Sequence, residues 1–323
     1  MQAIVGGCNL ILTPEMTLTL DAAGVLGPDG KSYSFDDRAN GYARGEGFGA
    51  LVLKRVSDAI RDGDVIRAVI RNSSTNSDGR SPGITQPTKR AQAALIKHVY
   101  TRAGLDPSLT RFFEAHGTGT AVGDPIEASA IGEVFAPYRS PEEPLFVGAL
   151  KSNVGHLEGA AGVAGLIKGV LTLESGVIPP NIWFEKRNPK ILDEWNLKFP
   201  TEPTPWPKAG LRRMSINSFG VGGSNAHVVM DDALHFLQAH RLRGSHRTAP
   251  WPRAELLLPA SLAPRAANTD VSNGAPNGTY TNGGHINGIS TNGIHTNGVH
   301  TNGAHTLGTR TIGEFQSSRL VIQ

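Results

Sequence analysis

Short apolar runs that give way to glycine-rich turns recur along residues 3–232, and this pattern constrains the fold most. The runs at 111–113 and 145–150 are each typical of a buried β-strand. A histidine follows each run within a glycine-rich segment, His116 after the first and His156 after the second. Glycine lets backbone and ligand approach closely, and α/β folds bind ligands at the carboxyl ends of strands. The two histidines are therefore the leading candidates for chemistry.

The rest of this region alternates between two kinds of secondary structure. Further strands are predicted at 3–7, 49–54, 65–71 and 228–230, of which 3–7 has the composition of a buried strand. Helices are predicted at 57–62, 88–103, 125–135 and 159–174, from apolar spacing, a proline in the first turn or a glycine cap. Strands that alternate with helices indicate an α/β architecture.

The bulk composition argues against several classes of protein. The 31 Lys+Arg and 28 Asp+Glu leave a net charge of +3, and the scattered basic residues do not favour nucleic-acid binding. The single cysteine excludes an internal disulfide framework and a cysteine-based zinc site, and it fits a reducing, cytoplasmic setting. We find no signal-peptide pattern and no run of about 18 apolar residues, so we expect no membrane association.

The C-terminal part has a different composition. Residues 241–323 lose periodicity, and 273–305 carry an imperfect Thr-Asn-Gly-x-His repeat. Such a composition cannot bury a core, so we expect a folded region at 1–240 followed by a disordered linker at 241–323. The regularly spaced histidines of the repeat leave adventitious metal binding open as an alternative to a plain flexible linker.

Lys151 stands five residues before His156 and directly after a predicted buried strand. A solvated surface position is the ordinary alternative for a lysine, and a core position held by backbone partners is the ordinary alternative for each histidine. The polar Ser-Asn pair that follows Lys151 can hold the lysine in a network. Two imidazoles in similar contexts favour a joint role, in which both donate to one developing oxyanion.

Two further segments are rich in glycine. The segment 217–227 is predicted to be either a tight turn or a mobile loop whose N–H groups contribute to an oxyanion hole. Phosphate binding is disfavoured there, because a strand follows where a helix N-terminus would be needed. In the segment 35–47, Arg44 and Glu46 are predicted to form a structural pair rather than catalytic groups.

Four motifs occur in a fixed order: Glu114-Ala-His-Gly-Thr-Gly-Thr, Gly123-Asp-Pro-Ile-Glu, Lys151-Ser-Asn-Val-Gly-His and Asn217-Ser-Phe-Gly-Val-Gly-Gly-Ser-Asn-Ala-His. Together with Gly41-Tyr-Ala-Arg-Gly-Glu-Gly, they resemble the β-ketoacyl synthase (ketosynthase) domain of type I polyketide synthases. The Asn-Gly-His linker is similar to linkers of the fungal highly reducing type. The resemblance implies a thiolase-like layered α/β fold, of which residues 1–240 would be the C-terminal half.

The resemblance also implies a reaction, the decarboxylative Claisen condensation. In this family a cysteine accepts the growing acyl chain, and the enolate formed from malonyl-carrier protein attacks it. His116 and His156 would stabilise the enolate oxygen, and Lys151 would order their network. Thr118 and Thr120 would contact the phosphopantetheine arm.

The remaining implied residues bind substrate. The Phe219 N–H would be an oxyanion donor and its ring would gate the acyl pocket, with Gly220 and Asn153 completing the substrate- and pantetheine-binding set. No metal or cofactor would bind the chain directly, because the phosphopantetheine belongs to an acyl carrier protein. The other expected partners are malonyl and acyl thioesters, further synthase domains and, for a complete domain, a second copy.

The nucleophile of the family is the one part of the pattern that is absent. It stands in a motif such as Asp-Thr-Ala-Cys-Ser-Ser, upstream of the strand that resembles residues 3–7, and the sequence holds no such motif. Cys8 follows two glycines without a helix that could activate a thiolate, so we interpret it as a small structural residue.

Several expectations follow from this departure. The N-terminal half of the domain would be absent, the chain alone would be inactive, and its start would be a gene-model or cloning boundary. Its exposed apolar surface and sheet edge would favour aggregation. The alternative is a non-catalytic truncated ketosynthase that acts as an interaction module or is merely a gene fragment. A serine hydrolase is disfavoured, because the sequence has no Gly-x-Ser-x-Gly elbow.

Overall fold

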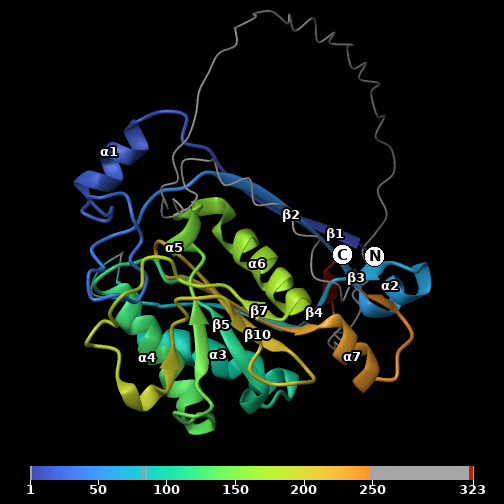
Figure 1. The fold of residues 1–323 in the computed structure, drawn as a ribbon. Helices are drawn as coiled ribbons and strands as arrows, with labels where there is room; N and C mark the ends of the chain where they lie inside the picture. Colours follow the sequence, from blue (N-terminus) through green and yellow to red (C-terminus); the bar gives the residue numbers. More distant parts are fainter. Residues whose placement is uncertain (1, 82, 84–85, 247–319, 323) are drawn as a thin grey trace, which may run out of the picture. The chain divides into compact units, whose positions relative to one another are not determined.

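The computed structural model describes residues 2–81, 83, 86–246 and 320–322. Its longer strands are β1 (Gln2–Asn9), β2 (Gly47–Arg55), β4 (Ala68–Ser77), β5 (Thr110–Glu114), β6 (Leu145–Gly148), β10 (Arg213–Gly220) and β11 (Ser224–Asp232). With the short β8 (Leu197–Lys198) and β13 (Leu320–Ile322), these described strands form one nine-stranded sheet in the order β1-β2-β13-β4-β11-β10-β5-β6-β8 (Figure 1). The neighbours from β10 to β8 are parallel, and the other pairs are antiparallel.

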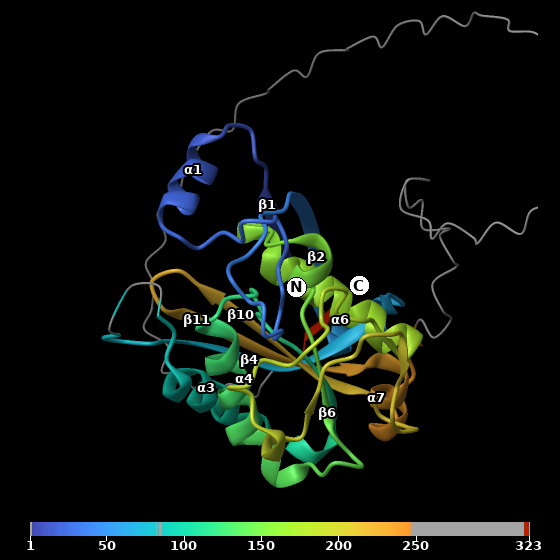
Figure 2. The same ribbon diagram turned by 60° about the vertical axis from the view of Figure 1, so that its left-hand side comes forward.

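Helices cover both faces of this sheet. The α-helices of the described residues are α1 (Glu15–Ala22), α2 (Val56–Asp62), α3 (Lys89–Ala103), α4 (Gly123–Phe135), α5 (Lys151–Val154), α6 (Ala161–Ser175) and α7 (Ala233–Ala239). Helix α6 lies across one face, whereas α3 and α4 lie on the other (Figures 1 and 2). Four two-residue strands pair outside the main sheet, β3 (Val65–Ile66) with β12 (Ser245–His246) and β7 (Val177–Ile178) with β9 (Thr204–Pro205). Within the described residues, no helix is long and apolar enough to cross a membrane.

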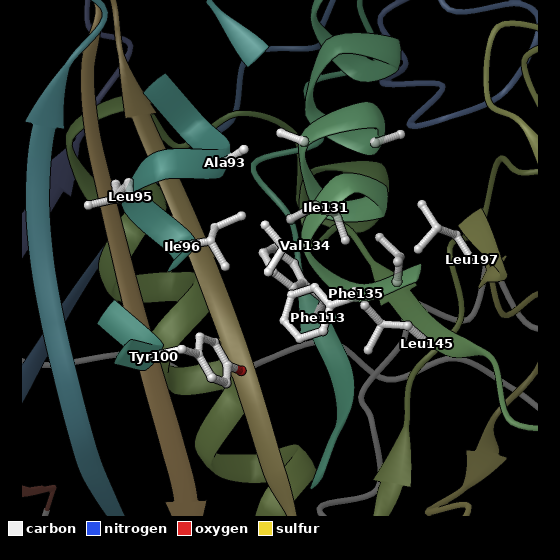
Figure 3. Packing of buried hydrophobic residues seen from close by; sticks show 14 of the residues in the cluster. Ala93, Leu95, Ile96, Tyr100, Phe113, Ile131, Val134, Phe135, Leu145 and Leu197 are labelled. Carbon is white, nitrogen blue, oxygen red and sulfur yellow. The ribbon is translucent and has the colours of Figure 1, made fainter. Parts of the chain in front are cut away.

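Strand β5 shows how the two faces of a central strand pack. Successive side chains of a strand point to opposite faces, so Phe112 packs in the cluster under α6 and Phe113 in the cluster under α3 and α4. The rings of Phe113 and Phe135 meet edge to face, with centroids 5.9 Å apart (Figure 3). Burying each such ring stabilises the fold by about 1.5–3 kcal/mol, which fixes the register of the strand that leads to His116.

The strand predicted at 3–7 is present as β1, but the prediction that it is buried is wrong. Ile4 is 78% exposed, and Phe48 on the neighbouring β2 is 86% exposed. Among the described residues, β1 pairs with β2 alone and is an edge strand of the sheet. An apolar run of this length predicts a strand but does not show which of its faces another element covers. The aggregation expected from this surface stays a prediction.

The predicted disordered linker needs correction at both ends. Ser245–His246 forms β12, and Leu320–Ile322 forms β13, which is antiparallel to both β2 and β4. Val321 and Ile322 are buried on opposite faces of the sheet. Because three consecutive apolar residues are enough to fill this position, composition averaged over the tail hides the strand. Residues 247–319, with the repeat and its histidines, lie outside the described part, so the linker prediction is untested there.

Candidate active site

The predicted histidines and lysine meet at one edge of the sheet. His116 follows β5, Lys151 follows β6, and Phe219 lies near the end of β10. These three strands are parallel neighbours, so their carboxyl ends lie together, as expected for a ligand site in an α/β fold.

The His116 ring is held by donors on one of its two nitrogens. The Phe219 N–H donates to His116 Nδ1 at 3.2 Å, and Lys151 Nζ lies 3.3 Å from the same nitrogen. Lys151 Nζ also donates to the His116 carbonyl at 2.6 Å. A backbone N–H and an ammonium group can only donate, so Nδ1 must accept and the ring proton is on Nε2.

His156 reaches the same tautomer by a different contact. The Glu158 N–H donates to His156 Nδ1 at 2.9 Å, which again assigns the ring proton to Nε2. The backbone of His156 is fixed by two hydrogen bonds, to the Ala43 carbonyl at 2.7 Å and from the Gly45 N–H at 2.9 Å. The two imidazoles are edge to face with centroids 5.5 Å apart. Each ring therefore has an Nε2–H that can donate to a ligand.

Burial keeps both rings neutral. It lowers the pKa of His116 well below the ordinary value, and the neighbouring Lys151 charge lowers it further. Burial and the Lys151 charge lower the pKa of His156 to about 3. Burial also lowers the pKa of Lys151 to about 8, against the opposing charges of nearby carboxylates. Near pH 7 the site therefore combines two neutral donors with one cation.

Two buried carboxylates near the start of α4 hold the His116 turn, and we predicted no role for either from the sequence. Glu127 accepts the N–H groups of His116 and Gly117 at 2.8 Å each. Asp124 accepts the N–H groups of Phe35 at 2.7 Å and Gly119 at 3.1 Å. The available signal was the pair of acids three positions apart near the start of α4, a spacing that places them on one face of a helix.

The segment predicted as a glycine-rich turn at 217–227 is mostly strand. It forms the β10–β11 hairpin, in which only 221–223 is the turn. The Phe219 N–H donates to His116 Nδ1 at 3.2 Å, and its role as an oxyanion donor stays a prediction. The Phe219 ring lies beside the His116 ring, with centroids 5.3 Å apart.

Four other residues were predicted to bind substrate or the pantetheine arm. Thr118 Oγ1 and Thr120 Oγ1 lie 3.1 Å apart on the half-buried turn after His116. Asn153 is exposed on α5, and its Oδ1 accepts from Ser152 Oγ at 2.8 Å. Gly220 is exposed at the end of β10. The binding roles of these four residues stay predictions.

The predicted pair of Arg44 and Glu46 is wrong. Arg44 Nε binds Glu158 Oε1 at 2.7 Å, and its Nη1 donates to Thr17 Oγ1 at 2.6 Å. Glu46 instead accepts the Ile11 N–H. The two side chains lie two residues apart in an irregular segment, and this spacing does not bring them together. Arg44 instead pairs with the turn that carries His156.

The sequence matches three consecutive β-ketoacyl synthase profiles. Residues 1–59 match the N-terminal domain, 67–185 the C-terminal domain, and 188–263 the ketoacyl-synthetase C-terminal extension. The chain belongs to the β-ketoacyl synthase family. The ketosynthase region predicted as a single unit at 1–240 is thus covered by more than one profile, and the match to the extension continues beyond it.

Curated relatives of this ketosynthase chain are fungal. Highly reducing polyketide synthase NEC1 of Pyricularia oryzae is 76% identical over 272 residues, covering 84% of the chain and 10% of that protein. Highly reducing polyketide synthase 40 of Fusarium mangiferae is 59% identical over 278 residues, covering 86% and 11%. The chain thus spans about a tenth of the length of these relatives. The predicted resemblance to the fungal highly reducing type is confirmed.

Solved ketosynthases share the fold. The ketosynthase from module 6 of the bacillaene synthase of Bacillus subtilis 168 superposes with a TM-score of 0.69 at 41% identity, covering 72% of this chain and 42% of that one. An oxazolomycin ketosynthase domain of Streptomyces albus gives 0.69 at 38% identity, covering 72% and 41%. The predicted thiolase-like α/β fold is confirmed.

Proposed function

We propose that the chain supplies the enolate-stabilising part of a ketosynthase site in polyketide biosynthesis, where the reaction is decarboxylative Claisen condensation. The observation that carries the proposal is a pair of neutral imidazoles that lie side by side. In each ring a backbone N–H donates to Nδ1, so the Nε2–H group stays available for a ligand. Such a pair can donate two hydrogen bonds to one oxygen.

In the proposed reaction, a malonyl thioester loses CO2. The bond to the carboxylate carbon breaks, and its electron pair forms an enolate whose charge collects on the thioester oxygen. Nε2–H groups of His116 and His156 donate to that oxygen as the charge appears, so they bind the transition state more tightly than the ground state. The enolate carbon then attacks an acyl thioester, and the thiolate leaves as the new carbon–carbon bond forms.

Lys151 contributes through position and charge. Its contacts with the carbonyl and Nδ1 of His116 keep Nδ1 an acceptor and the Nε2 proton directed away from it. Its positive charge, present below a pKa of about 8, also favours a nearby developing anion.

The proposed reaction also needs an acyl-accepting cysteine, and we assign this role to a group outside the given sequence. Cys8 is exposed on β1, and we assign it no catalytic role. The malonyl group would arrive on the phosphopantetheine of an acyl carrier protein, whose arm the hydroxyls of Thr118 and Thr120 can contact. A homodimer, neighbouring synthase domains and a cytoplasmic location are further parts of the proposal.

Decarboxylation tests the proposal, because it needs no acyl-cysteine. The chain can therefore catalyse this step even though we expect it to be inactive in the full condensation. Malonyl-pantetheine would be incubated with the chain and CO2 release measured. We expect His116→Ala and His156→Ala each to slow release about 10²–10³-fold, as for loss of an oxyanion donor. His98→Ala, at an exposed position of α3, is the matched control and should leave the rate unchanged.

A second candidate is a non-catalytic ketosynthase fragment that acts as an interaction module. The exposed apolar side chains of β1 and β2, Ile4 and Phe48 among them, favour it. A folded chain that releases CO2 no faster than the thioester does by itself would support this candidate and exclude the first.

A further inference from the structure

His227 is a buried histidine outside the proposed reaction. It lies on β11, its side chain is fully buried, and its ring packs against Phe113 and Tyr100 with centroids 5.7 and 6.3 Å away. Burial lowers its pKa to about 3, so the ring is neutral. A polar group in such surroundings costs free energy unless it forms a hydrogen bond.

One hydrogen bond connects this ring to the catalytic turn. His227 Nδ1 lies 2.7 Å from Asn217 Oδ1, directly across the β10–β11 pair. Asn217 Nδ2 donates to Glu127 Oε1 at 2.9 Å. The Glu127 carboxylate in turn accepts the N–H groups of His116 and Gly117. The ring of His227 is thus linked to the backbone of His116 through two side chains.

The chemistry of the chain of contacts fixes the direction of each bond. A carboxylate can only accept, so the Asn217 atom beside Glu127 must be the amide nitrogen. The Asn217 oxygen therefore faces His227, and His227 Nδ1 must carry the ring proton. Within the described residues, His227 Nε2 has no hydrogen-bond partner, which agrees with an unprotonated nitrogen against apolar rings.

We propose that His227 is a positioning residue, whose Nδ1–H locks the Asn217 amide so that its NH2 group, and not its oxygen, faces Glu127. The Glu127 carboxylate then keeps all three of its donors, and the turn that aims His116 stays in place. Since the contact between His227 and the catalytic ring is indirect, its effect passes entirely through Asn217 and Glu127.

The charge of Glu127 is the quantity most sensitive to this lock. Burial raises the pKa of Glu127, whereas its three hydrogen bonds and the Lys151 charge lower it. Asp124, on the same helix face, is coupled to it by repulsion. Without a donor at His227, the Asn217 amide can rotate and present its oxygen to Glu127. That arrangement requires a protonated Glu127.

The test compares two replacements of His227 in the full chain. His227→Asn keeps an N–H donor at the position of Nδ1, and His227→Leu removes it. Glu127 would be titrated by the ¹³C shift of its carboxyl group, and amide hydrogen exchange would be followed at His116 and Gly117. Neither readout requires turnover, so the result is independent of the condensation proposed above.

We expect the leucine variant to titrate Glu127 at higher pH than wild type and to exchange both amides about tenfold faster, the effect of one lost hydrogen bond. The asparagine variant should restore both values. A folded leucine variant that matches wild type, or an asparagine variant no better than leucine, would overturn the proposal.

If the leucine variant fails to fold, His227→Gln replaces it, because its amide lies one bond farther out and reaches the position of Nε2 instead. Rescue by Asn and not by Gln supports the proposal, and equal behaviour of the two overturns it.

Discussion

The two turns that carry His116 and His156 reach the same result by different means. Both rings accept at Nδ1, present Nε2–H and have a lowered pKa. The His116 turn is held by Glu127, which is 3% exposed and reaches two consecutive N–H groups. The His156 turn is held by main-chain pairing and by Glu158, whose side chain is 30% exposed in its ion pair with Arg44.

The two turns should differ in how strongly a substitution destabilises them. A buried carboxylate that serves several donors fixes a turn tightly, but its loss leaves every donor unpaired in a medium of low polarity. A partly exposed ion pair contributes little, because water can replace it. The first turn should therefore be fragile to substitution and the second tolerant.

The largest contrast is expected between Glu127→Gln and Glu158→Gln. Glutamine at 127 offers one acceptor oxygen to three buried donors and turns an NH2 group toward at least one of them. Each orphaned group costs about 1–3 kcal/mol, so we expect the free energy of unfolding to fall by about 4 kcal/mol. Glu158→Gln should cost less than about 1 kcal/mol. Urea unfolding measures both, and equal losses would remove the distinction between the turns.

Alanine at the two glycines provides a second contrast. Gly117 has φ +43°, and an added Cβ would lie 2.5 Å from Ala149 Cβ. Gly155 has φ +74°, and its Cβ would lie 3.0 Å from the Arg44 carbonyl. The positive φ costs each variant about 1–3 kcal/mol, and overpacking adds about 1–3 kcal/mol at Gly117. We expect a loss of about 3 kcal/mol for Gly117→Ala and a smaller loss for Gly155→Ala by thermal unfolding. The opposite order would show that the His156 turn is the tighter one.

Acid should destabilise the folded chain, because it holds His116 and His156 as neutral rings. Their pKa is lowered in the folded state, so the unfolded chain takes up protons first and stability falls as pH drops below the ordinary value. With a folded pKa of about 3 against 6.5 for His156, the loss at pH 5 is about 2 kcal/mol for this residue. Urea midpoints at pH 7 and pH 5 should therefore differ less in His156→Asn than in wild type. An unchanged difference would mean that His156 is not buried as a neutral ring.

The smallest effect is expected for Glu158→Gly. Glu158 has φ +42°, a conformation that glycine adopts without strain. Relief of strain and loss of the ion pair with Arg44 should nearly cancel, leaving a change of less than about 1 kcal/mol. Because the N–H at position 158 remains, the ¹⁵N shifts of the His156 ring should still report the Nε2–H tautomer. A switch of tautomer would show that Arg44, and not the backbone, fixes the ring.

Prediction from the sequence succeeded where a local pattern was sufficient. Apolar runs followed by glycine placed His116 and Lys151 at strand ends, and helical spacing and a glycine cap located α3 within one residue of its start. It failed where a partner is distant in sequence. Arg44 and Glu158 are 114 positions apart. Asn217, which contacts His227, binds the Glu127 carboxylate 90 positions away. No periodicity reports such contacts.

By itself, the sequence determined the α/β class and the family, and it singled out the two histidines and the lysine that we propose carry the chemistry. Periodicity and glycine act over a few residues and are written directly into the chain. Only the tertiary structure decided that β1 is exposed, that the distant segment Leu320–Ile322 enters the sheet, and that Glu127, Asn217 and His227 stand behind His116. These outcomes depend on which surfaces meet after folding, because burial and hydrogen-bond pairing are properties of packed elements and not of any one segment.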